Sequence, residues 1–309
     1  MSLVEVDMCP WQGRVDAGEG PRALRWHQCV APYTTDAAPG VALLGFACDE
    51  GVRRNQGRLG AAEGPTALRK ALANLAWHGS RPVFDAGDLR CLGEDLEGAQ
   101  QALAARVAEL IGAGQLPLLL GGGHETAWGS FQGLARAMPD ARFGIINLDA
   151  HFDLRQSAQA SSGTPFAQIG AWHQRHGRPF DYLCLGVAEP SNSAALFDTA
   201  RNFGLSWWLD EDLESARLPA LLAQIDEFCA GVDAVQLSID LDVLPASVMP
   251  AVSAPAARGV PLEYIEAILE RVKASGRLAL AEVVEFNPRF DIDHHGARCA
   301  ARLLWKLAR

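Results

Sequence analysis

The sequence alternates short, almost wholly apolar runs with longer segments in which apolar residues recur at helical spacing. The apolar runs are 41–48, 116–122, 143–149, 182–187, 234–242 and 278–286. A strand that is apolar at nearly every position is buried on both faces, as in a parallel sheet covered by helices. The helical segments between the runs are 65–76, 96–114, 125–138, 218–231 and 261–276, and a last helix follows at the C-terminus. The alternation predicts an α/β fold with an open, mostly parallel sheet.

The rest of the chain sets the domain organisation and excludes some partners. No internal repeat or low-complexity linker occurs, so we expect residues 1–309 to form a single domain. Residues 1–39 carry no clear pattern, and we expect an irregular N-terminal extension packed on that domain. The net charge is −10 and there is no run of Lys or Arg, which argues against a nucleic-acid partner.

The sequence also indicates a cytoplasmic protein. The N-terminus lacks the basic region, apolar core and cleavage site of a secretory signal, and no apolar stretch approaches the ~18 residues that span a membrane. The seven cysteines are scattered and form no CxxC pair, and Cys48 and Cys184 lie inside predicted strands. We therefore expect reduced thiols and no association with a membrane.

Acidic residues and histidines follow three of the predicted strands. In open α/β sheets, ligands bind beyond the carboxyl ends of the strands. The segment GGGHE follows run 116–122, DAHFD follows run 143–149, and IDLD ends run 234–242. A spacing of two in extended chain points side chains to the same side. The residues brought to this edge are His124, Asp149, His151, Asp153, Asp240 and Asp242.

These side chains form a donor set for two divalent metal ions. Four carboxylates without cations would repel one another strongly. Oxygen and imidazole donors without a thiolate favour Mn²⁺, Fe²⁺ or Zn²⁺. A pair of such ions lowers the pKa of a bound water and makes it a nucleophile near neutral pH. A single His or Asp at a strand end is usually a cap or a turn residue, and neither a Walker motif nor GxGxxG is matched. The combination of three motifs favours the metal site.

The motifs resemble the ureohydrolase family, which includes arginase, agmatinase and formimidoylglutamase. The resemblance runs from about residue 40 to the C-terminus and rests on GGGHE, NLDAHFDLR, SIDLDVLP with PAVSAP, and EVVEFNP. It implies a three-layer α/β/α arginase-like fold with helices on both faces of the central sheet. It also implies two Mn²⁺ ions per subunit, a small-molecule substrate, and a homo-oligomer, either a trimer or a hexamer.

The resemblance assigns a role to each site residue. Asp149 and Asp240 would bridge the two ions, and the terminal ligands would be His124 with Asp153 and His151 with Asp242. The implied reaction is hydrolysis of a C–N bond in an amidino or guanidino group. Glu285, in EVVEFNP, matches the family carboxylate that pairs with the cationic group of the substrate. Read without the resemblance, Glu285 is a strand-end residue in a surface ion pair.

Within the family, the segments DEGVRRNQGRLGAAEGPTALR, HFDLRQSAQASSGTPFAQ and VSAPAARGV look most like formimidoylglutamase. That enzyme hydrolyses N-formimidoyl-L-glutamate to L-glutamate and formamide in histidine degradation. Its substrate carries two carboxylates, so cationic groups are needed. Arg155 points to the site by alternation, and Arg53, Arg54 and Arg58 flank the loop after the first predicted strand. The alternatives are a urea-releasing guanidino-acid hydrolase and a metal-binding member without turnover.

One departure from the family concerns proton transfer. Arginases and agmatinases place a histidine beside the stretch that reads SSGTPF here, where Ser162 stands among the expected substrate-binding residues. The missing imidazole argues against arginase or agmatinase activity. His173 and His176 are expected at the surface of the following helix, and His294 and His295 at the start of the last one. Glu125 either orients His124 or serves as a first-turn helix acid.

Overall fold

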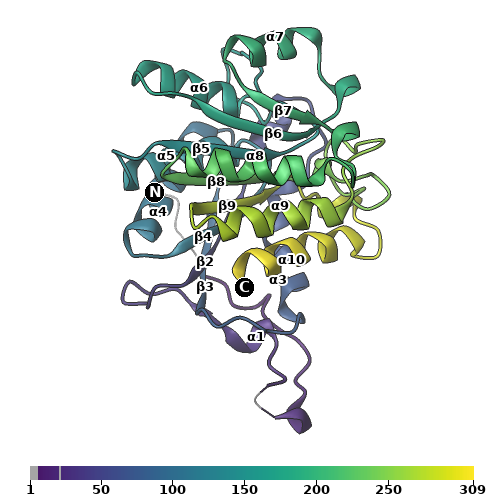
Figure 1. Ribbon diagram of the computed structural model, residues 1–309. Coiled ribbons are helices and arrows are strands. Elements are labelled where there is room, and N and C mark those ends of the chain that lie inside the picture. Colours follow the sequence, from purple (N-terminus) through teal and green to yellow (C-terminus); the bar gives the residue numbers. More distant parts are fainter. Residues whose placement is uncertain (1–5, 21) are drawn as a thin grey trace.

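A computed structural model describes residues 6–20 and 22–309 of the protein. Nine strands form one sheet in the order β1-β3-β2-β4-β9-β8-β5-β6-β7 (Figure 1). Every pairing between these strands is parallel, as the continuous apolar runs predicted. The strands are β1 (Val30–Pro32), β2 (Val41–Ala47), β3 (Val83–Arg90), β4 (Leu116–Leu120), β5 (Phe143–Leu148), β6 (Asp181–Val187), β7 (Ser206–Leu209), β8 (Ala234–Asp240) and β9 (Leu278–Val284).

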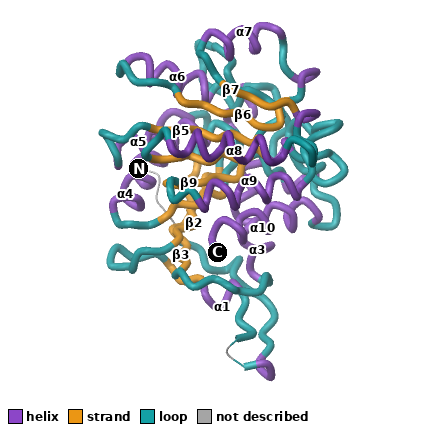
Figure 2. Tube along the Cα trace, viewed as in Figure 1, coloured by secondary structure: helices purple, strands orange, loops and turns teal. Residues whose placement is uncertain are grey.

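Helices cover both faces of the sheet, so the structure has the three layers that were expected (Figures 1 and 2). One face packs against α3 (Gly64–Ala73), α8 (Leu218–Ala230), α9 (Leu262–Ala274) and α10 (His295–Ala308). The other face packs against α4 (Leu96–Gly112), α5 (Thr126–Ala137), α6 (Pro165–Arg175) and α7 (Ala194–Asn202). Of two short helices, α1 (Trp26–Cys29) lies within the N-terminal extension, and α2 (Glu50–Arg54) follows β2.

Strand β2 shows how its sequence serves both layers. Val41 and Leu43 join the hydrophobic cluster on one face, and Ala42 and Leu44 join the cluster on the other face. All four side chains are fully buried. Because each buried Leu or Val contributes about 1.5–3 kcal/mol, a strand that is apolar throughout is stable only between two layers of helices.

Strand β3 was not among the predicted strands, because it carries Asp85 and Asp88 in place of an apolar run. Asp85 is fully buried and accepts hydrogen bonds from Nε and Nη2 of Arg69, at 2.7 and 3.0 Å. Asp88 accepts a further bond from Nη1 of Arg69 at 2.6 Å. The strand is therefore buried together with a paired cation from α3, which the local pattern does not reveal.

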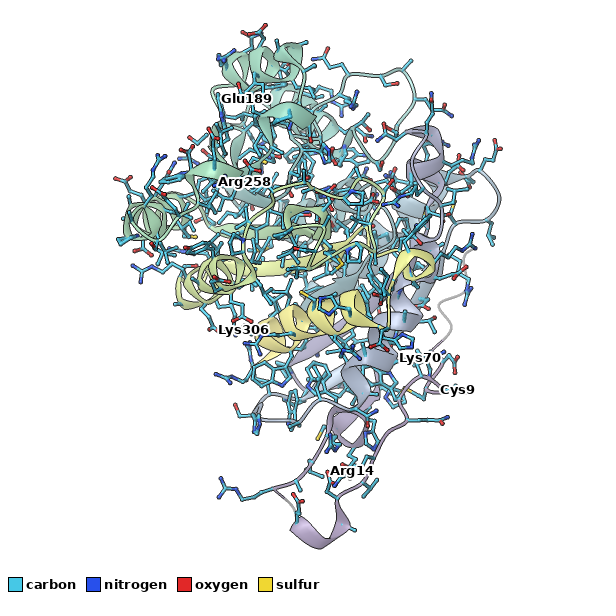
Figure 3. All side chains as sticks on the ribbon, turned by 90° about the vertical axis from the view of Figure 1, so that its right-hand side faces the viewer. Cys9, Arg14, Lys70, Glu189, Arg258 and Lys306 are labelled. Carbon is cyan, nitrogen blue, oxygen red and sulfur yellow. The ribbon has the colours of Figure 1, made fainter. Side chains whose placement is uncertain are left out.

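The N-terminal extension is more regular than expected, since it contains α1 and β1 within residues 1–39. It is attached through Trp11, whose indole stacks on Trp26 and donates a hydrogen bond to Asp85 Oδ2 at 2.6 Å. The part around Arg14 projects from the body of the molecule (Figure 3). Residues 1–5 of the predicted extension lie outside the described part of the chain.

The centre of the sheet determines where chemistry is possible. Strands β4, β9, β8 and β5 are consecutive neighbours, and their carboxyl ends lie at one edge because all pairings are parallel. The four motifs singled out in the sequence follow these four strands. Among the described residues, no helix combines the length and the apolar character needed to cross a membrane.

Candidate metal centre

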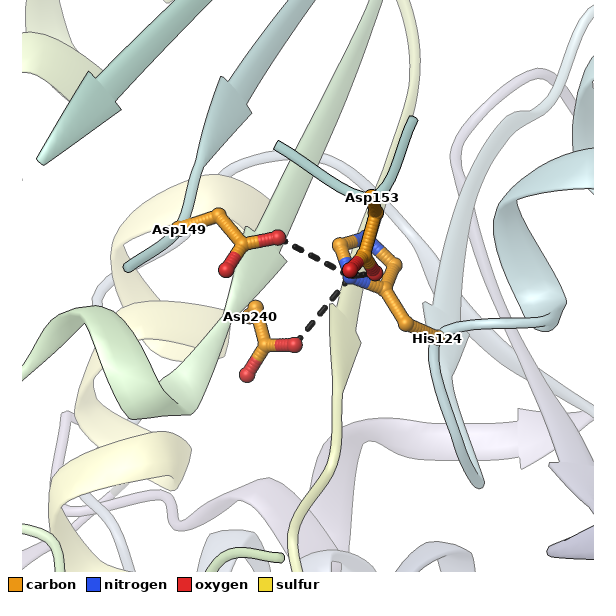
Figure 4. Close-up of side chains that lie close together, drawn as sticks. All are labelled: His124, Asp149, Asp153 and Asp240. Carbon is orange, nitrogen blue, oxygen red and sulfur yellow. Dashed lines mark ion pairs between the residues drawn. The ribbon is translucent and has the colours of Figure 1, made fainter. Parts of the chain in front are cut away.

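The structure brings all six predicted ligands together in two groups that share one residue. Four side chains converge in the first group, with their ligand atoms within 4.8 Å of one another (Figure 4): His124, Asp149, Asp153 and Asp240. The second group consists of Asp149, His151 and Asp242. Metal binding by these residues stays a prediction, whereas their convergence is observed.

In the first group, Nδ1 of His124 faces three carboxylates. It lies 3.2 Å from Asp149 Oδ2, 3.0 Å from Asp153 Oδ2 and 3.1 Å from Asp240 Oδ2. His124 is almost completely buried, and Nδ1 has no hydrogen-bond partner among the described residues. A buried ring nitrogen that points at three acceptors without a hydrogen bond is placed for a cation in the space between them.

In the second group, Nδ1 of His151 lies 3.1 Å from Asp242 Oδ2 and 3.5 Å from Asp149 Oδ1. Asp149 thus presents one oxygen to each group, which is the geometry of a bridging carboxylate. Asp240 belongs to the first group only, and its Oδ1 accepts a hydrogen bond from the backbone N–H of Asp242 at 2.9 Å. The bridging role expected for Asp240 is therefore less apparent than that of Asp149.

The pKa values of these residues are shifted because the groups are buried and their charges lie close together. Burial would lower the pKa of His124, but its three carboxylate neighbours raise that pKa well above the usual value. The charge of Asp242 raises the pKa of His151 to about 12. Burial raises the pKa of Asp242 to about 6. A divalent ion that binds here would compete with protons for these imidazole and carboxylate groups.

The donor set fits divalent ions. Donor atoms that sit about 2.1 Å from an ion at right angles to one another are ~3 Å apart. The separations of 3.0–3.2 Å around Nδ1 of His124 match this value. Neither group contains a cysteine, and imidazole with carboxylate donors suits Mn²⁺, Fe²⁺ or Zn²⁺.

The three glycines before His124 let its loop pass close to the backbone of another segment. Gly123 donates a hydrogen bond from its N–H to Cys48 O at 3.0 Å. A Cβ added at Gly122 would lie 1.7 Å from that same oxygen. Because this neighbour is rigid backbone just after β2, a larger residue at Gly122 would displace the loop that carries His124.

Glu285 adjoins the first group of residues through the backbone of His124. Its Oε1 accepts a hydrogen bond from the backbone N–H of His124 at 2.8 Å, while Oε2 has no partner among the described residues. The side chain is only 5% exposed, so the alternative interpretation of Glu285 as a member of a surface ion pair is wrong. Burial and the charges of Asp240 and Glu125 raise its pKa well above the usual value. A buried carboxylate with a free oxygen is placed to bind a cation.

Two residues of the site have positive φ angles, which residues other than glycine rarely adopt. The φ angles of Asp153 and Glu285 are 49° and 66°. Left-handed torsions at residues other than glycine cost about 1–3 kcal/mol and persist where the surrounding structure enforces them. Here the Glu285 N–H donates to Gly122 O at 2.8 Å, and Asp153 O accepts from the Phe166 N–H at 3.2 Å.

Arg155, two residues after Asp153 in the chain, lines a polar cavity of ≈ 640 Å³ to which none of the six predicted ligands contributes. The guanidinium of Arg155 is exposed and has no hydrogen bond or ion pair within the described part of the chain. Ser162, on the loop that precedes α6, is buried. In the first turn of α6, the ring of Phe166 packs edge-on against the His124 imidazole, with centroids 5.2 Å apart.

The other three arginines named in the sequence are held by protein groups, Arg53 by the Glu50 carboxylate. Arg54 donates to Glu50 Oε1 at 2.8 Å and to Glu97 Oε1 at 2.6 Å, although it also lines the cavity of Arg155. Arg58 donates from Nε to Ser253 O at 3.0 Å, and its guanidinium lies over the Phe290 ring. Arg54 and Arg58 therefore fix loops around the site in this structure.

The remaining histidines differ in part from expectation. His176 is exposed, and His294 and His295 begin α10, as predicted. The expectation that His173 lies at the surface is wrong, because its side chain is 1% exposed and packed among aromatic rings. Burial lowers its pKa to about 4, so it is a neutral core residue.

Sequence reasoning missed the residues behind the ligands. Ser238 contacts the imidazole of His124, and Asn147 donates from Nδ2 to Asp149 Oδ2 at 3.0 Å. Each of them lies two residues before a predicted aspartate ligand, Asp240 or Asp149, on the same side of its strand. A polar residue at this spacing in an otherwise apolar run was the signal available in the sequence.

Comparison with known proteins gives a consistent result. The model of the arginase family matches residues 39–309. The formimidoylglutamase of Chromobacterium violaceum is 61% identical over 304 residues, which cover 98% of each chain. That of Aeromonas hydrophila is 56% identical over 306 residues, again with 98% of each chain covered.

Solved structures agree on the fold. The crystal structure of formimidoylglutamase from Bacillus subtilis aligns with a TM-score of 0.83 at 21% identity and covers 93% of this chain and 92% of that one. The crystal structure of Trypanosoma cruzi formiminoglutamase with Mn²⁺ aligns with a TM-score of 0.78 at 25% identity, over 87% of this chain and 92% of that one. From the conserved layout and the full-length matches, we conclude that the chain belongs to the arginase family.

Proposed function

We propose that the protein is a two-metal formimidoylglutamase, which converts N-formimidoyl-L-glutamate and water into L-glutamate and formamide. The observation that carries the proposal is the buried Glu285 carboxylate, which adjoins the ligand groups and has one oxygen free. Relatives named formimidoylglutamase that are 61% and 56% identical along almost the whole chain support the choice of substrate.

The ions would be held by the two groups that share Asp149. His124, Asp153 and Asp240 would complete one site, and His151 and Asp242 the other. Manganese is proposed because the donors are oxygen and imidazole and because the T. cruzi relative was solved with Mn²⁺. Two divalent ions supply a nucleophile by lowering the pKa of water, and they stabilise negative charge in the transition state.

Glu285 would bind and orient the amidinium group. Its free Oε2 accepts a hydrogen bond from a cationic N–H, while Oε1 stays fixed by the His124 backbone. Because the site is buried, this contact is stronger than the same contact in water. It holds the electron-poor amidine carbon beside the ligand groups, and the amine of glutamate leaves when the C–N bond breaks.

Arg155 would bind a carboxylate of the substrate. Its guanidinium is exposed at the polar cavity and is free of ion pairs to the described residues. A free guanidinium binds a carboxylate through two parallel hydrogen bonds. Arg54 lines the same cavity, but Glu50 and Glu97 offset its charge. Arg155 is therefore the first choice, with Arg54, Arg58 and Ser162 shaping the surroundings.

Two further parts of the proposal concern the assembly and its location. The family resemblance suggests a homo-oligomer, a trimer or a hexamer, which light scattering on the purified protein measures directly. All seven cysteines are free thiols in the structure, which suits a reducing compartment such as the cytoplasm.

A substrate panel tests the proposed function. Purified protein loaded with Mn²⁺ is incubated with N-formimidoyl-L-glutamate, 4-guanidinobutyrate, agmatine and arginine, and formamide and urea are both quantified. The proposal predicts formamide from the first substrate and no urea from the others at comparable rates. Faster urea release from a guanidino acid would contradict it and favour a guanidino-acid hydrolase. No turnover of any of the four would favour a metal-binding protein without activity.

A further inference from the structure

The DAHFD loop, residues 149–153, leaves the sheet at the end of β5 and carries three of the six predicted ligands. At its start the Asp149 N–H still donates to Leu185 O of β6 at 3.0 Å. At Phe152 this pairing has ended. Within the described part of the chain, both backbone polar groups of Phe152 are hydrogen-bonded by side chains alone. Since buried backbone groups need partners, these side chains determine the course of the loop.

Asn192, in the segment between β6 and α7, is bonded to the DAHFD loop in two places. Its Oδ1 accepts a hydrogen bond from the Phe152 N–H at 3.1 Å, and its Nδ2 donates to Ala150 O at 2.9 Å. Nδ2 also donates to Ala188 O at 2.9 Å, within its own segment. The oxygen and the nitrogen of the amide are thus both engaged, which fixes the orientation of this buried side chain.

The bond to Phe152 is the one that no other group replaces. Ala150 O also accepts from the Ala188 N–H at 2.9 Å, and Ala188 O also accepts from the Ser191 N–H at 3.0 Å. The Phe152 N–H has no second acceptor among the described residues. Loss of the Asn192 amide would therefore leave a buried N–H without a partner, and the loop would have to shift to satisfy it.

Phe152 stands between two predicted ligands that belong to different groups. His151 belongs to the group that includes Asp242, and Asp153 belongs to the group around His124. A shift of the backbone at Phe152 would therefore displace one donor of each group. Binding sites of this kind need their donors held to within about 0.5 Å of the productive geometry. The loop thus needs a fixed anchor at this point.

We propose that Asn192 is a positioning residue of the metal centre, which holds the backbone at Phe152 so that His151 and Asp153 stay aligned for two ions. This inference rests on the proposed function, because it takes these two residues as ligands. The hydrogen bonds of Asn192 go to backbone atoms only, so it acts on the donors through the course of the chain. An amide that only stabilised the fold would leave metal affinity unchanged.

The substitution Asn192→Leu tests this role, because it removes the hydrogen bonds with little change of volume. The matched control is Gln115→Met. Gln115 is also buried, at 5% exposure, and its Nε2 donates to the backbone carbonyl of Ala38 at 2.9 Å. It immediately precedes β4, so it lies at the amino edge of the sheet and the ligands at the carboxyl edge. A second variant, Asn192→Ala, removes the same bonds and requires less space.

The measurement is the affinity for Mn²⁺, without substrate, from the electron paramagnetic resonance signal of free Mn²⁺ during titration of metal-free protein. Loss of an outer hydrogen-bond partner typically lowers metal affinity by about 10- to 100-fold. We expect a loss of this size for both ions in Asn192→Leu. Gln115→Met is expected to bind both ions as the wild type does. Thermal unfolding of the metal-free proteins shows whether each variant is folded at the temperature of the titration.

The outcomes separate the inference from the proposed function. Unchanged affinity in Asn192→Leu would overturn the positioning role while the proposed function stands. An equal loss in Gln115→Met, or a loss in Asn192→Leu that is confined to one ion, would overturn it as well. If Asn192→Leu is not folded, Asn192→Ala decides: normal binding of both ions by this variant overturns the inference. Wild-type protein that binds fewer than two ions would contradict the proposed function and the inference together.

Discussion

The backbone N–H of His124 donates a hydrogen bond to Glu285 Oε1 over 2.8 Å. A residue proposed to bind metal is thus joined to the carboxylate proposed to bind the amidinium. The two come from the ends of β4 and β9, which are adjacent strands of the sheet. The same edge of the sheet therefore fixes the two residues relative to one another.

This relationship leads to a prediction for Glu285→Gln. The amide keeps the shape and can still accept the bond from His124, but it lacks the charge that pairs with the amidinium. Loss of a buried ionic partner costs about 2–5 kcal/mol, so kcat/KM for N-formimidoyl-L-glutamate should fall by at least ~30-fold. Steady-state kinetics and metal analysis are to be measured together. An unchanged kcat/KM at two ions per chain would exclude Glu285 from substrate binding.

A second prediction concerns Arg155→Met. The substitution keeps a long apolar stem and removes the guanidinium from the cavity. A hydrogen bond to a charged group contributes about 1.5–3 kcal/mol, so KM should rise by ~10- to 100-fold with a smaller change in kcat. Arg201→Met is the control, because Arg201 pairs with Asp198 on the exposed side of α7. If both variants have the wild-type KM, another residue binds the carboxylates.

A third prediction concerns stability at β3. Arg69→Met leaves the carboxylate of Asp85 buried without its cation, and such a loss costs about 3–5 kcal/mol. Arg142→Met removes an exposed pair with Asp181, and about 0–1 kcal/mol is expected there. Urea-induced unfolding of the two variants gives both values. Equal and small losses would show that the hydrogen bonds from Trp11 and from the Gly87 backbone N–H suffice to stabilise the Asp85 carboxylate.

These cases show which features the sequence could reveal. The convergence of the six proposed ligands was predictable because they follow strands in a parallel sheet, and parallel strands bring their carboxyl ends to one edge. Strand β3 was not predictable from its own pattern, since the partner of Asp85 is Arg69, on a helix that precedes it in the chain. Local periodicity carries no information about a polar group that is satisfied by a distant residue.

Contacts with residues distant in the sequence also decide the roles of individual histidines and arginines. His173 was expected at the surface of its helix, yet its ring packs against Phe131 and Phe180. Arg58 looked free to bind substrate, yet it donates to the Ser253 carbonyl. In each case the packing of another element decides the role, and spacing along the chain does not record that packing.

The burial of His173 leads to a prediction of pH dependence. Its pKa is lowered to about 4 because the ring is desolvated, whereas in the unfolded chain it is ~6.5. Above pH 6.5 the ring is neutral in both states and costs nothing. As the pH falls from ~6.5 toward 4, only the unfolded chain takes up this proton, so the free energy of unfolding decreases.

The test compares the wild type with His173→Leu in metal-free form, by urea-induced unfolding at several pH values. The difference in unfolding free energy between the two proteins should shift in favour of His173→Leu as the pH is lowered through this window. The other titrating groups are common to both proteins and cancel in the difference. A difference that does not vary between pH 7 and pH 4 would contradict a neutral, buried His173.

The most direct test of the two-metal account is formamide release from N-formimidoyl-L-glutamate as a function of the Mn²⁺ bound per chain. Metal-free protein is titrated, and bound metal and initial rate are measured on the same samples. We predict no release without metal and a rate that reaches its plateau at two ions per chain, with Asp149→Asn losing both metal and activity. Release of formamide by metal-free protein, or no release at two bound ions, would contradict the account.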